Sequence, residues 1–409
     1  AGNLISGFRQ WWQTNVDILD QKDAFEKLGT NATWNMNGPS DSDPAYWNNP
    51  YWQRYNNYET DTRNRFIGYA KLDWEATSFM TVTARVSADY YSYIQEERLA
   101  IGSIAEAFGV GYDDVASGYS LRSGSFSEYN YDLMARFNKN INEDLSITGL
   151  IGTNIRKQKS SDLWTSTNGG LAVEGVYSLA NTKSPMQLPK ESAEEIQVNG
   201  YFANASLGIK NFLYLEGSVR VDQSSTLPED NNTYLYPSAS ASFIFSKFIQ
   251  NDWFSFGKLR LNYAEVGNDA PFASLYNVYY QSFPFNGNGV ASNNGSTGSE
   301  RVNNNPDLKS ERTKSIEAGL SLNFIQNRIG FDISIYDNRT VDQIMPAAVS
   351  YSTGKSFQYV NAGEVSNKGV EIMINATPYK TNNFNWDINL NWAKNKNEVV
   401  SLAEGLDNY

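Results

Sequence analysis

The chain has neither cysteine nor histidine among its 409 residues. Without cysteine it can form no disulfide, thiolate nucleophile or thiolate metal site. Without histidine it lacks the commonest general base and the usual nitrogen ligand of zinc. Adjacent carboxylates such as Glu96 and Glu97 would point to opposite faces of a strand, so they form no acid–base pair by default. We therefore expect no enzyme activity and no catalytic, cofactor-binding or metal-binding residues.

Long apolar runs and an excess of positive charge are also missing. No segment approaches the ~18 consecutive apolar residues expected of a membrane helix. The 33 basic and 45 acidic residues give a net charge of −12, which disfavours a nucleic-acid partner. A membrane-spanning β-barrel remains compatible with these values, because its strands carry hydrophobic residues only at alternate positions.

Aromatic residues are abundant, with 10 Trp, 26 Tyr and 21 Phe. Tyr and Trp suit a membrane–water boundary because the ring is apolar and its polar tip can stay wet. The stretch 384–392 shows how they are placed. Its apolar residues are Trp386, Ile388, Leu390 and Trp392, with Asp387, Asn389 and Asn391 between them. Side chains alternate along a strand, so this pattern predicts one apolar and one polar face.

The same alternation recurs about a dozen times, which is typical of outer-membrane barrels. The predicted strands are 65–77, 79–90, 125–139, 144–156, 193–208, 211–222, 233–248, 256–267, 311–325, 328–341, 367–379 and 384–397. Every second connection is short and the others are long, as in barrels whose long loops face outward. The sequence therefore predicts an all-β fold, a transmembrane antiparallel β-barrel with long extracellular loops. Those loops are 91–124, 157–192, 268–310 and 342–366.

Within this organisation, residues 1–62 are predicted to form an extracellular loop region with a helix at 17–28. Residues 63–409 are predicted to supply barrel strands.

Several motifs resemble those of the SusC/RagA class of TonB-dependent outer-membrane transporters. The clearest is 305–313, which reads Asn-Pro-Asp-Leu-Lys-Ser-Glu-Arg-Thr and opens a strand after the longest loop. The other similar segments are 11–17, 257–263 with Gly267 and Asn268, 360–364 with 367–371, and 391–400. Their Asn, Gly, Pro and Glu residues are expected to fix turns and strand ends. Their value is therefore as a family signature covering essentially the whole chain.

The resemblance implies a function and a set of partners. It implies a place in the bacterial outer membrane and TonB-dependent import of a nutrient, such as a glycan, oligosaccharide or peptide. A SusD-like surface lipoprotein would help to capture the substrate, and TonB with ExbB and ExbD would supply energy through a plug domain. Plugged transporters have 22 strands, so the chain is expected to be part of such a barrel, with the plug and remaining strands absent from it.

Two sets of side chains are candidates for contact with a substrate. Aromatic residues in the polar N-terminal region could stack on sugar rings while Asn and Asp bind hydroxyls, or they could instead fold the loop or contact a partner. They are Trp11, Trp12, Trp34, Trp47, Tyr51 and Trp52. Charged residues on the polar faces of strands could line the lumen and steer a ligand, hold the plug, or simply form ion pairs between strands. They are Arg85, Asp89, Asp132, Arg136, Glu216, Arg220, Arg260 and Glu371.

Three other functions remain open from the sequence. A SusC-like barrel could serve as a structural scaffold in a larger outer-membrane assembly, with its loops as docking surfaces. A passive porin of about twelve strands would be complete without a plug. A secreted β protein that binds or cleaves glycans would be recovered without detergent.

Overall fold

The computed structural model describes residues 8, 11–277, 280–285, 288–292 and 302–402. Part of the predicted loop 268–310 lies outside these residues. The structure divides into two compact units. The first comprises 1–68, 88–128 and 158–195, and the second comprises 69–87, 129–157 and 196–409.

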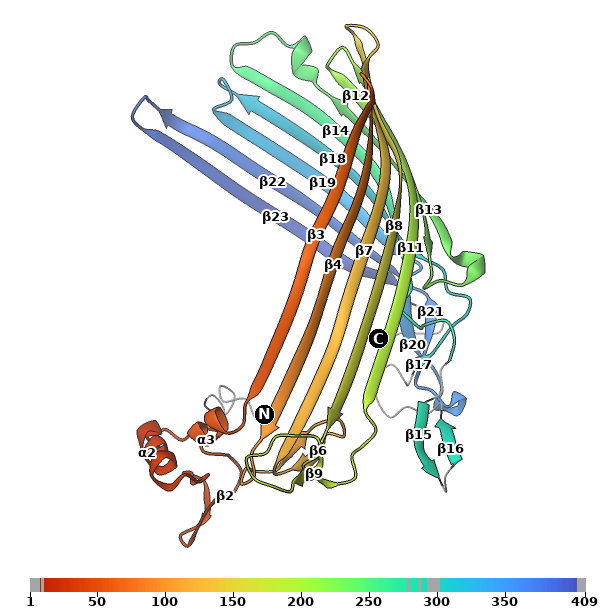
Figure 1. Ribbon diagram of the computed structural model, residues 1–409. Helices are drawn as coiled ribbons and strands as arrows, with labels where there is room; N and C mark the ends of the chain where they lie inside the picture. The colour runs from red at the N-terminus through yellow and green to blue at the C-terminus, as the bar shows by residue number, and fades with distance from the viewer. Residues whose placement is uncertain (1–7, 9–10, 278–279, 286–287, 293–301, 403–409) are drawn as a thin grey trace. The chain divides into compact units, whose positions relative to one another are not determined.

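Twelve long strands form one sheet, in the order β23-β22-β19-β18-β14-β13-β12-β11-β8-β7-β4-β3. Each long strand therefore pairs with the next long strand along the chain, which is the up-and-down order of outer-membrane barrels. The bounds are β3 (Glu59–Thr77), β4 (Met80–Leu99), β7 (Gly118–Asn140), β8 (Leu145–Ser166), β11 (Lys190–Ile209), β12 (Leu213–Ser224), β13 (Thr233–Phe243), β14 (Phe254–Asn268), β18 (Glu311–Phe324), β19 (Ile329–Val341), β22 (Glu364–Lys380) and β23 (Asn385–Ser401). In Figure 1, β18, β19, β22 and β23 run side by side.

Small elements occupy the N-terminal region and the long connections. The helices are α2 (Ile18–Leu28) and α3 (Pro50–Tyr55), with 3-10 turns η1 (Glu229–Asn231), η2 (Phe245–Phe248) and η4 (Tyr351–Thr353). The short strands are β1 (Met36–Gly38), β2 (Asp41–Pro44), β5 (Glu106–Phe108), β6 (Asp113–Val115), β9 (Asn168–Leu171), β10 (Thr182–Ser184), β15 (Tyr280–Phe285), β16 (Asn288–Ser292), β17 (Val302–Asn303), β20 (Ile344–Ala348) and β21 (Phe357–Asn361). Among the described residues, no helix has the length and apolar character needed to cross a membrane.

The twelve predicted strands are confirmed, but several of their bounds were wrong. β4 continues to Leu99 and β8 to Ser166, so both reach into the predicted loops 91–124 and 157–192. β3 already begins at Glu59, inside the predicted loop region 1–62, and β13 ends at Phe243 instead of 248. Strand ends that are polar on both faces lose the alternation from which a strand is recognised. Alternation therefore underestimated the length of β3, β4 and β8. In β13 the apolar residues continue past the strand into η2, so its length was overestimated.

Two predicted turns and the N-terminal helix are confirmed. Lys210 and Asn211 at one turn, and Gln326 and Asn327 at the other, have positive φ values between 48° and 64°. Left-handed pairs of this kind suit tight hairpins because their twist matches that of the flanking strands. The helix α2 is capped at its N-terminus by Asp17, whose side chain accepts a hydrogen bond from the Leu19 amide at 2.8 Å.

One face of the second unit, which we call the apolar face, carries rows of hydrophobic residues that run across β14, β18, β19, β22 and β23. Strand pairing places Leu259, Leu320, Ile333, Ile372 and Trp392 in one row. The next row towards the short turns is Gly257, Leu322, Phe331, Ile374 and Leu390. On β18 this apolar character extends from Ile316 to Phe324. A tilted strand needs ~9–11 residues to cross a bilayer, so this stretch is long enough.

The opposite face of the same strands, which we call the polar face, is hydrophilic. Between the two apolar rows lies a row of Lys258, Ser321, Asp332, Met373 and Asn391. The next row is Arg260, Gly319, Ser334, Glu371 and Ala393. In an outer-membrane barrel the apolar side of each strand contacts lipid and the polar side lines the interior. The second unit therefore has the two faces that a barrel wall requires.

Aromatic rings cluster where the short turns meet the apolar face. Trp253 stacks on Phe324 with ring centroids 5.4 Å apart, and Phe243 stacks on Phe248 at 5.8 Å. Trp253 and Phe248 are mostly exposed, at 58% and 63%. Exposed aromatic residues at the edge of an apolar band form the girdles that flank the membrane in such barrels.

Candidate functional site and family membership

The predicted substrate-binding aromatics divide into an exposed pair and a packed group. Trp11 and Trp47 stack with centroids 5.6 Å apart, and both remain exposed, at 53% and 40%. Trp12 lies between Phe8 at 4.9 Å and Trp34 at 6.1 Å, and its indole N–H donates to the Val16 carbonyl. The exposed Trp11–Trp47 pair is thus the part of the set that offers open ring surface to a ligand.

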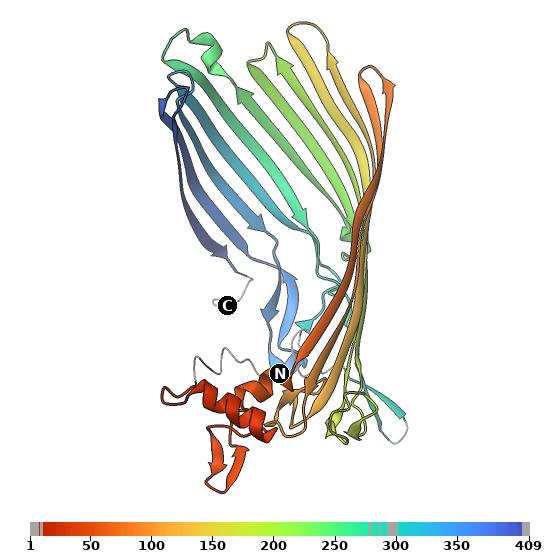
Figure 2. The same cartoon turned by 60° about the vertical axis from the view of Figure 1, so that its left-hand side comes forward.

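The last two predicted aromatics lie on the short helix α3, which Figure 2 shows beside α2. Tyr51 stacks on Tyr55 at 6.4 Å. Trp52 is 7% exposed, and its indole N–H donates to the Ser103 hydroxyl at 2.8 Å. Trp52 therefore packs α3 against the loop after β4, and its place in the structure is that of a core residue.

The asparagines of this region form a scaffold that the sequence analysis did not identify. Asn49 is fully buried; its amide nitrogen donates to the carbonyls of Gln21 at 2.8 Å and Ala32 at 2.7 Å. Its side-chain oxygen accepts from the Tyr51 amide at 2.8 Å, capping α3. Asn31 in turn accepts from the Asn49 backbone amide. The sequence signal was the Asn-Pro pair that begins a helix, because Asn is a preferred N-cap and Pro a preferred first residue.

The clearest of the predicted lumen charges is Arg260 on the polar face. Its guanidinium binds both oxygens of Asp332, at 2.7 and 3.0 Å, although β18 lies between their strands. Gly319 makes this reach possible, because a Cβ at this position would lie 2.7 Å from the guanidinium. A glycine inside a strand often marks such a close approach, and this signal was available in the sequence.

Further ion pairs hold other predicted lumen residues. Arg85 binds Asp132 at 2.8 Å, and Asp132 also accepts from Asn154 at 2.7 Å. Asp89 forms two hydrogen bonds with Arg65, at 2.6 and 2.9 Å.

Arg220 lies between Asp222, 2.8 Å away, and the Tyr236 hydroxyl at 2.9 Å. Of the eight predicted residues, Arg136, Glu216 and Glu371 make no ion pair within the described part of the chain. These three exposed side chains are the ones still available to a ligand.

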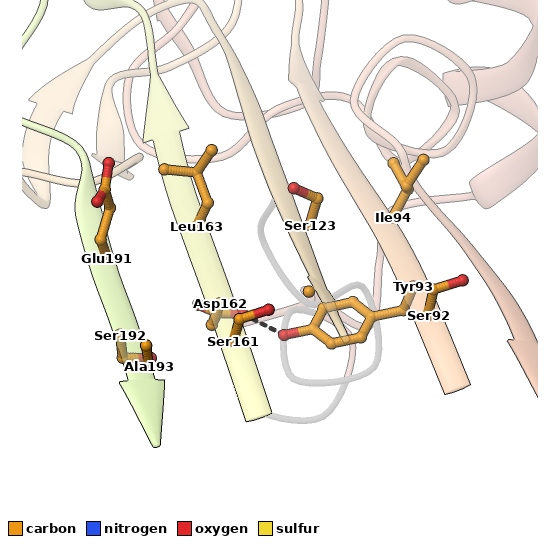
Figure 3. A pocket seen from close by; sticks show the side chains of 11 residues that line it. Ser92, Tyr93, Ile94, Ser123, Ser161, Asp162, Leu163, Glu191, Ser192 and Ala193 are labelled. Carbon is orange, nitrogen blue, oxygen red and sulfur yellow. Dashed lines mark hydrogen bonds between the residues drawn. The ribbon is translucent and has the colours of Figure 1, made fainter. Parts of the chain in front are cut away.

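A hollow of about 760 Å³, lined by both polar and apolar groups, lies in the first unit between the loop ends of β4, β7, β8 and β11 (Figure 3). The Tyr93 hydroxyl donates to Asp162, and the same carboxylate accepts from Arg122 at 2.9 Å. Gly124 leaves room for the Tyr93 ring, since a Cβ there would come within 2.8 Å of it. Pockets of ~300–1,000 Å³ with a few fixed polar groups are typical ligand sites. Most of the residues that line this hollow fall in the predicted loops 91–124 and 157–192, so the hollow was not predicted from sequence.

Beside this hollow, a hydrogen-bonded network joins the loop ends of three strands. The Tyr119 hydroxyl donates to Glu96 at 2.6 Å, and Arg98 binds Glu96 at 3.0 Å and Thr60 at 3.0 Å. Burial and the neighbouring Glu96 carboxylate raise the pKa of Tyr119 to about 12. The hydrogen bond from Tyr119 is the main cause that lowers the pKa of Glu96. Glu96 is therefore a charged anchor between strands.

Two of the segments that resemble family motifs bind one another. Leu308 is fully buried in a small core with Leu227 and Ala270. The Asn361 side chain accepts from the Lys309 amide and donates to the Lys309 carbonyl, both at 2.8 Å. These contacts fix the strand ends at 305–313 and 360–364, as expected for turn-forming motif residues.

Comparisons with known proteins agree with this architecture. A TonB-dependent receptor of Formosa agariphila is 25% identical over 425 residues, covering 100% of this chain and 41% of that protein. The TonB-dependent receptor SusC of Bacteroides thetaiotaomicron is 29% identical over 218 residues, covering 51% of this chain and 21% of its own length. Among solved structures, the RagAB peptide transporter matches with a TM-score of 0.79 at 19% identity, over 92% of this chain and 40% of that one.

The chain thus spans less than half the length of these relatives. The predicted all-β architecture is confirmed. The predicted outer-membrane location is also confirmed, since TonB-dependent receptor barrels reside in the bacterial outer membrane. The family described as TonB dependent receptor-like, beta-barrel, matches residues 9–408. This chain belongs to that family, and its resemblance to SusC and RagA is confirmed.

Proposed function

We propose that the whole protein imports a glycan, oligosaccharide or peptide across the outer membrane, with TonB, ExbB and ExbD supplying the energy. A SusD-like surface lipoprotein would deliver the substrate. The observation that carries this proposal is the hollow around Tyr93 and Asp162 at the loop ends of the strands. In such barrels the long loops face the outside, so a substrate would reach this end first.

The lining of the hollow fits a ligand that presents both hydrogen-bonding groups and apolar surface. Glu191 supplies a carboxylate and Ser123, Ser161 and Ser192 supply hydroxyls, beside the hydrogen-bonded Tyr93–Asp162 pair. Leu163 and Ile94 add apolar surface. Sugars and peptides both present amide or hydroxyl groups beside apolar patches, and such mixtures suit a pocket of this composition. No step of chemistry on the substrate is needed for this function.

The exposed Trp11–Trp47 pair supports the same proposal from the N-terminal region. Its flat rings are suited to stacking on a sugar or on a side chain of the lipoprotein. We do not assign substrate binding to the ion-paired residues of the polar face, because Arg260 and Arg85 already have carboxylate partners. They stabilise the wall or contact the plug.

Filling the hollow should reduce uptake. We expect Ser192→Trp to lower the rate of import by about tenfold, which corresponds to ~1.4 kcal/mol of lost binding. The matched control Ser192→Thr keeps the hydroxyl and should transport at a rate near normal. The measurement is uptake of fluorescently labelled peptides and oligosaccharides by cells that carry the full-length protein. Normal uptake by Ser192→Trp would show that this hollow is not on the substrate's path.

The same assay separates the proposal from its alternatives. Uptake that disappears when TonB is deleted supports energy-coupled import. Uptake that continues without TonB would identify a passive porin. Deleting the protein could instead leave the uptake of every probe unchanged while an outer-membrane complex fails to assemble. That result would identify a scaffold.

A further inference from the structure

A band of charged side chains lies on the apolar face, directly beyond the hydrophobic rows and on the side of the long connections. Strand pairing places Tyr263, Ile316, Asp337, Lys368 and Lys396 in one row, and Glu265, Lys314, Arg339, Ser366 and Glu398 in the next. Arg312, Glu364 and Lys394 flank these rows. We call these residues the charged band. None of the proposed substrate contacts belongs to the charged band, so substrate binding does not account for its charges.

The charged band is positive, although the chain as a whole carries −12. Its cations are Arg312, Lys314, Arg339, Lys368, Lys394 and Lys396, and its anions are Glu265, Asp337, Glu364 and Glu398. Six cations therefore face four carboxylates. A positive surface next to an apolar one is complementary to an anion that carries hydrocarbon chains.

The ion pairs inside the band leave cations uncompensated. Lys368 binds Asp337 at 3.2 Å and Lys396 binds Glu398 at 2.7 Å. Lys314 and Lys394 make no ion pair with any described residue. Lys368 and Lys396 also stand directly opposite each other on β22 and β23. The Glu398 carboxylate acts on both of these lysines, so the cations left without a carboxylate are Lys314 and Lys394.

The side chains of the band can reach an anion at the membrane surface. Lys396 is 74% exposed and Lys368 is 54% exposed. Lysine can lay its hydrocarbon stem along an apolar surface while its ammonium group reaches the polar boundary. The row immediately below the band, which includes Leu261, Ile335 and Val370, offers that apolar surface.

We propose that the charged band binds the phosphate groups of a lipid headgroup at the outer surface of the membrane. The acyl chains of that lipid would lie on the hydrophobic rows. Its phosphates would lie beside Lys314 and Lys394, the two cations that no described carboxylate compensates, with Lys368 and Lys396 nearby. The charged band is continuous with the hydrophobic rows. This favours a lipid over a soluble phosphate, because a free anion would not contact the hydrophobic rows.

The test uses full-length protein in neutral detergent and the bis-phosphorylated glycolipid lipid A as the probe. Binding is measured by titration and native mass spectrometry. Changing Lys314, Lys368, Lys394 and Lys396 together to Gln should weaken binding by about tenfold or more, because each Lys near an anionic lipid surface contributes measurably. The corresponding four changes to Arg should keep binding near the wild-type value, and they also show that the sites tolerate substitution.

A matched control removes four lysines near the short turns, by changing Lys139, Lys210, Lys247 and Lys380 to Gln. This variant should bind lipid A like the wild type. Dephosphorylated lipid A should bind the wild-type protein about tenfold more weakly or worse, as the loss of charge-assisted contacts requires. Equal binding by the wild type and the four-Gln variant would overturn the proposal. So would displacement of lipid A by an equimolar amount of inorganic phosphate.

Discussion

Replacing Ile333 with Arg should destabilise the folded barrel by about 2–4 kcal/mol, the cost of an Arg near the midplane on a lipid-facing strand. Ile333 lies on the apolar face, between Leu320 on one neighbouring strand and Ile372 on the other. An arginine there must leave its guanidinium in hydrocarbon or deform the membrane around it. The measurement is the free energy of unfolding of full-length protein in lipid vesicles, from a denaturant titration.

The adjacent residue provides the control. Ser334→Arg places the same side chain on the polar face, directly opposite Glu371, which makes no ion pair within the described residues. A new Arg–Glu pair between neighbouring strands is worth ~0–1 kcal/mol, so we expect this variant to lose little stability. Equal destabilisation by the two variants would contradict the assignment of the two faces.

Asn49→Ala should open the N-terminal region, with a loss of at least about 3 kcal/mol in its local stability. The substitution leaves the carbonyls of Gln21 and Ala32 and the amide of Tyr51 without their partner, and each unsatisfied buried group costs ~1–3 kcal/mol. Hydrogen exchange of the amides between 18 and 57 measures this loss directly.

Asn37→Ala tests whether the effect is specific to the buried site. Asn37 is exposed, and its amide donates to Asp41 at 3.2 Å. Exposed substitutions of this kind change stability by about 0.5 kcal/mol or less. If both variants exchange at the wild-type rate, the asparagine scaffold does not hold this region together.

Alternation allowed the sequence to predict the strands wherever one side meets lipid. Around Leu390 and Trp392, apolar and polar residues alternate because the two faces meet different surroundings. Strand pairing confirms that pattern, with Leu390 beside Ile374 and Trp392 beside Ile372. The same physical contrast explains why β12 and β14 were located closely from sequence alone.

Where water reaches both faces of a strand, the alternation of apolar and polar residues disappears. The loop ends of β4 and β8 are polar on both sides, so the hollow around Tyr93 was assigned to loops. The ion-pair partners of the charged residues could not be predicted from the sequence either, because they depend on the register between neighbouring strands. Arg260 binds Asp332 only because Gly319 lies between them. The role of Asn49 likewise depends on residues distant in the chain.

The central claim is that alternate residues of each strand face lipid and the barrel interior. Measuring the surroundings of successive residues along β19 tests this claim most directly. The chain contains no cysteine, so single cysteines at 331–336 can carry nitroxide labels one at a time, with any cysteine elsewhere in the full-length protein replaced by Ser. In lipid vesicles, contact with lipid-dissolved oxygen should be high at 331, 333 and 335 and low at 332, 334 and 336. Equal oxygen contact at all six positions, or a maximum at the even ones, would show that this face does not meet the membrane.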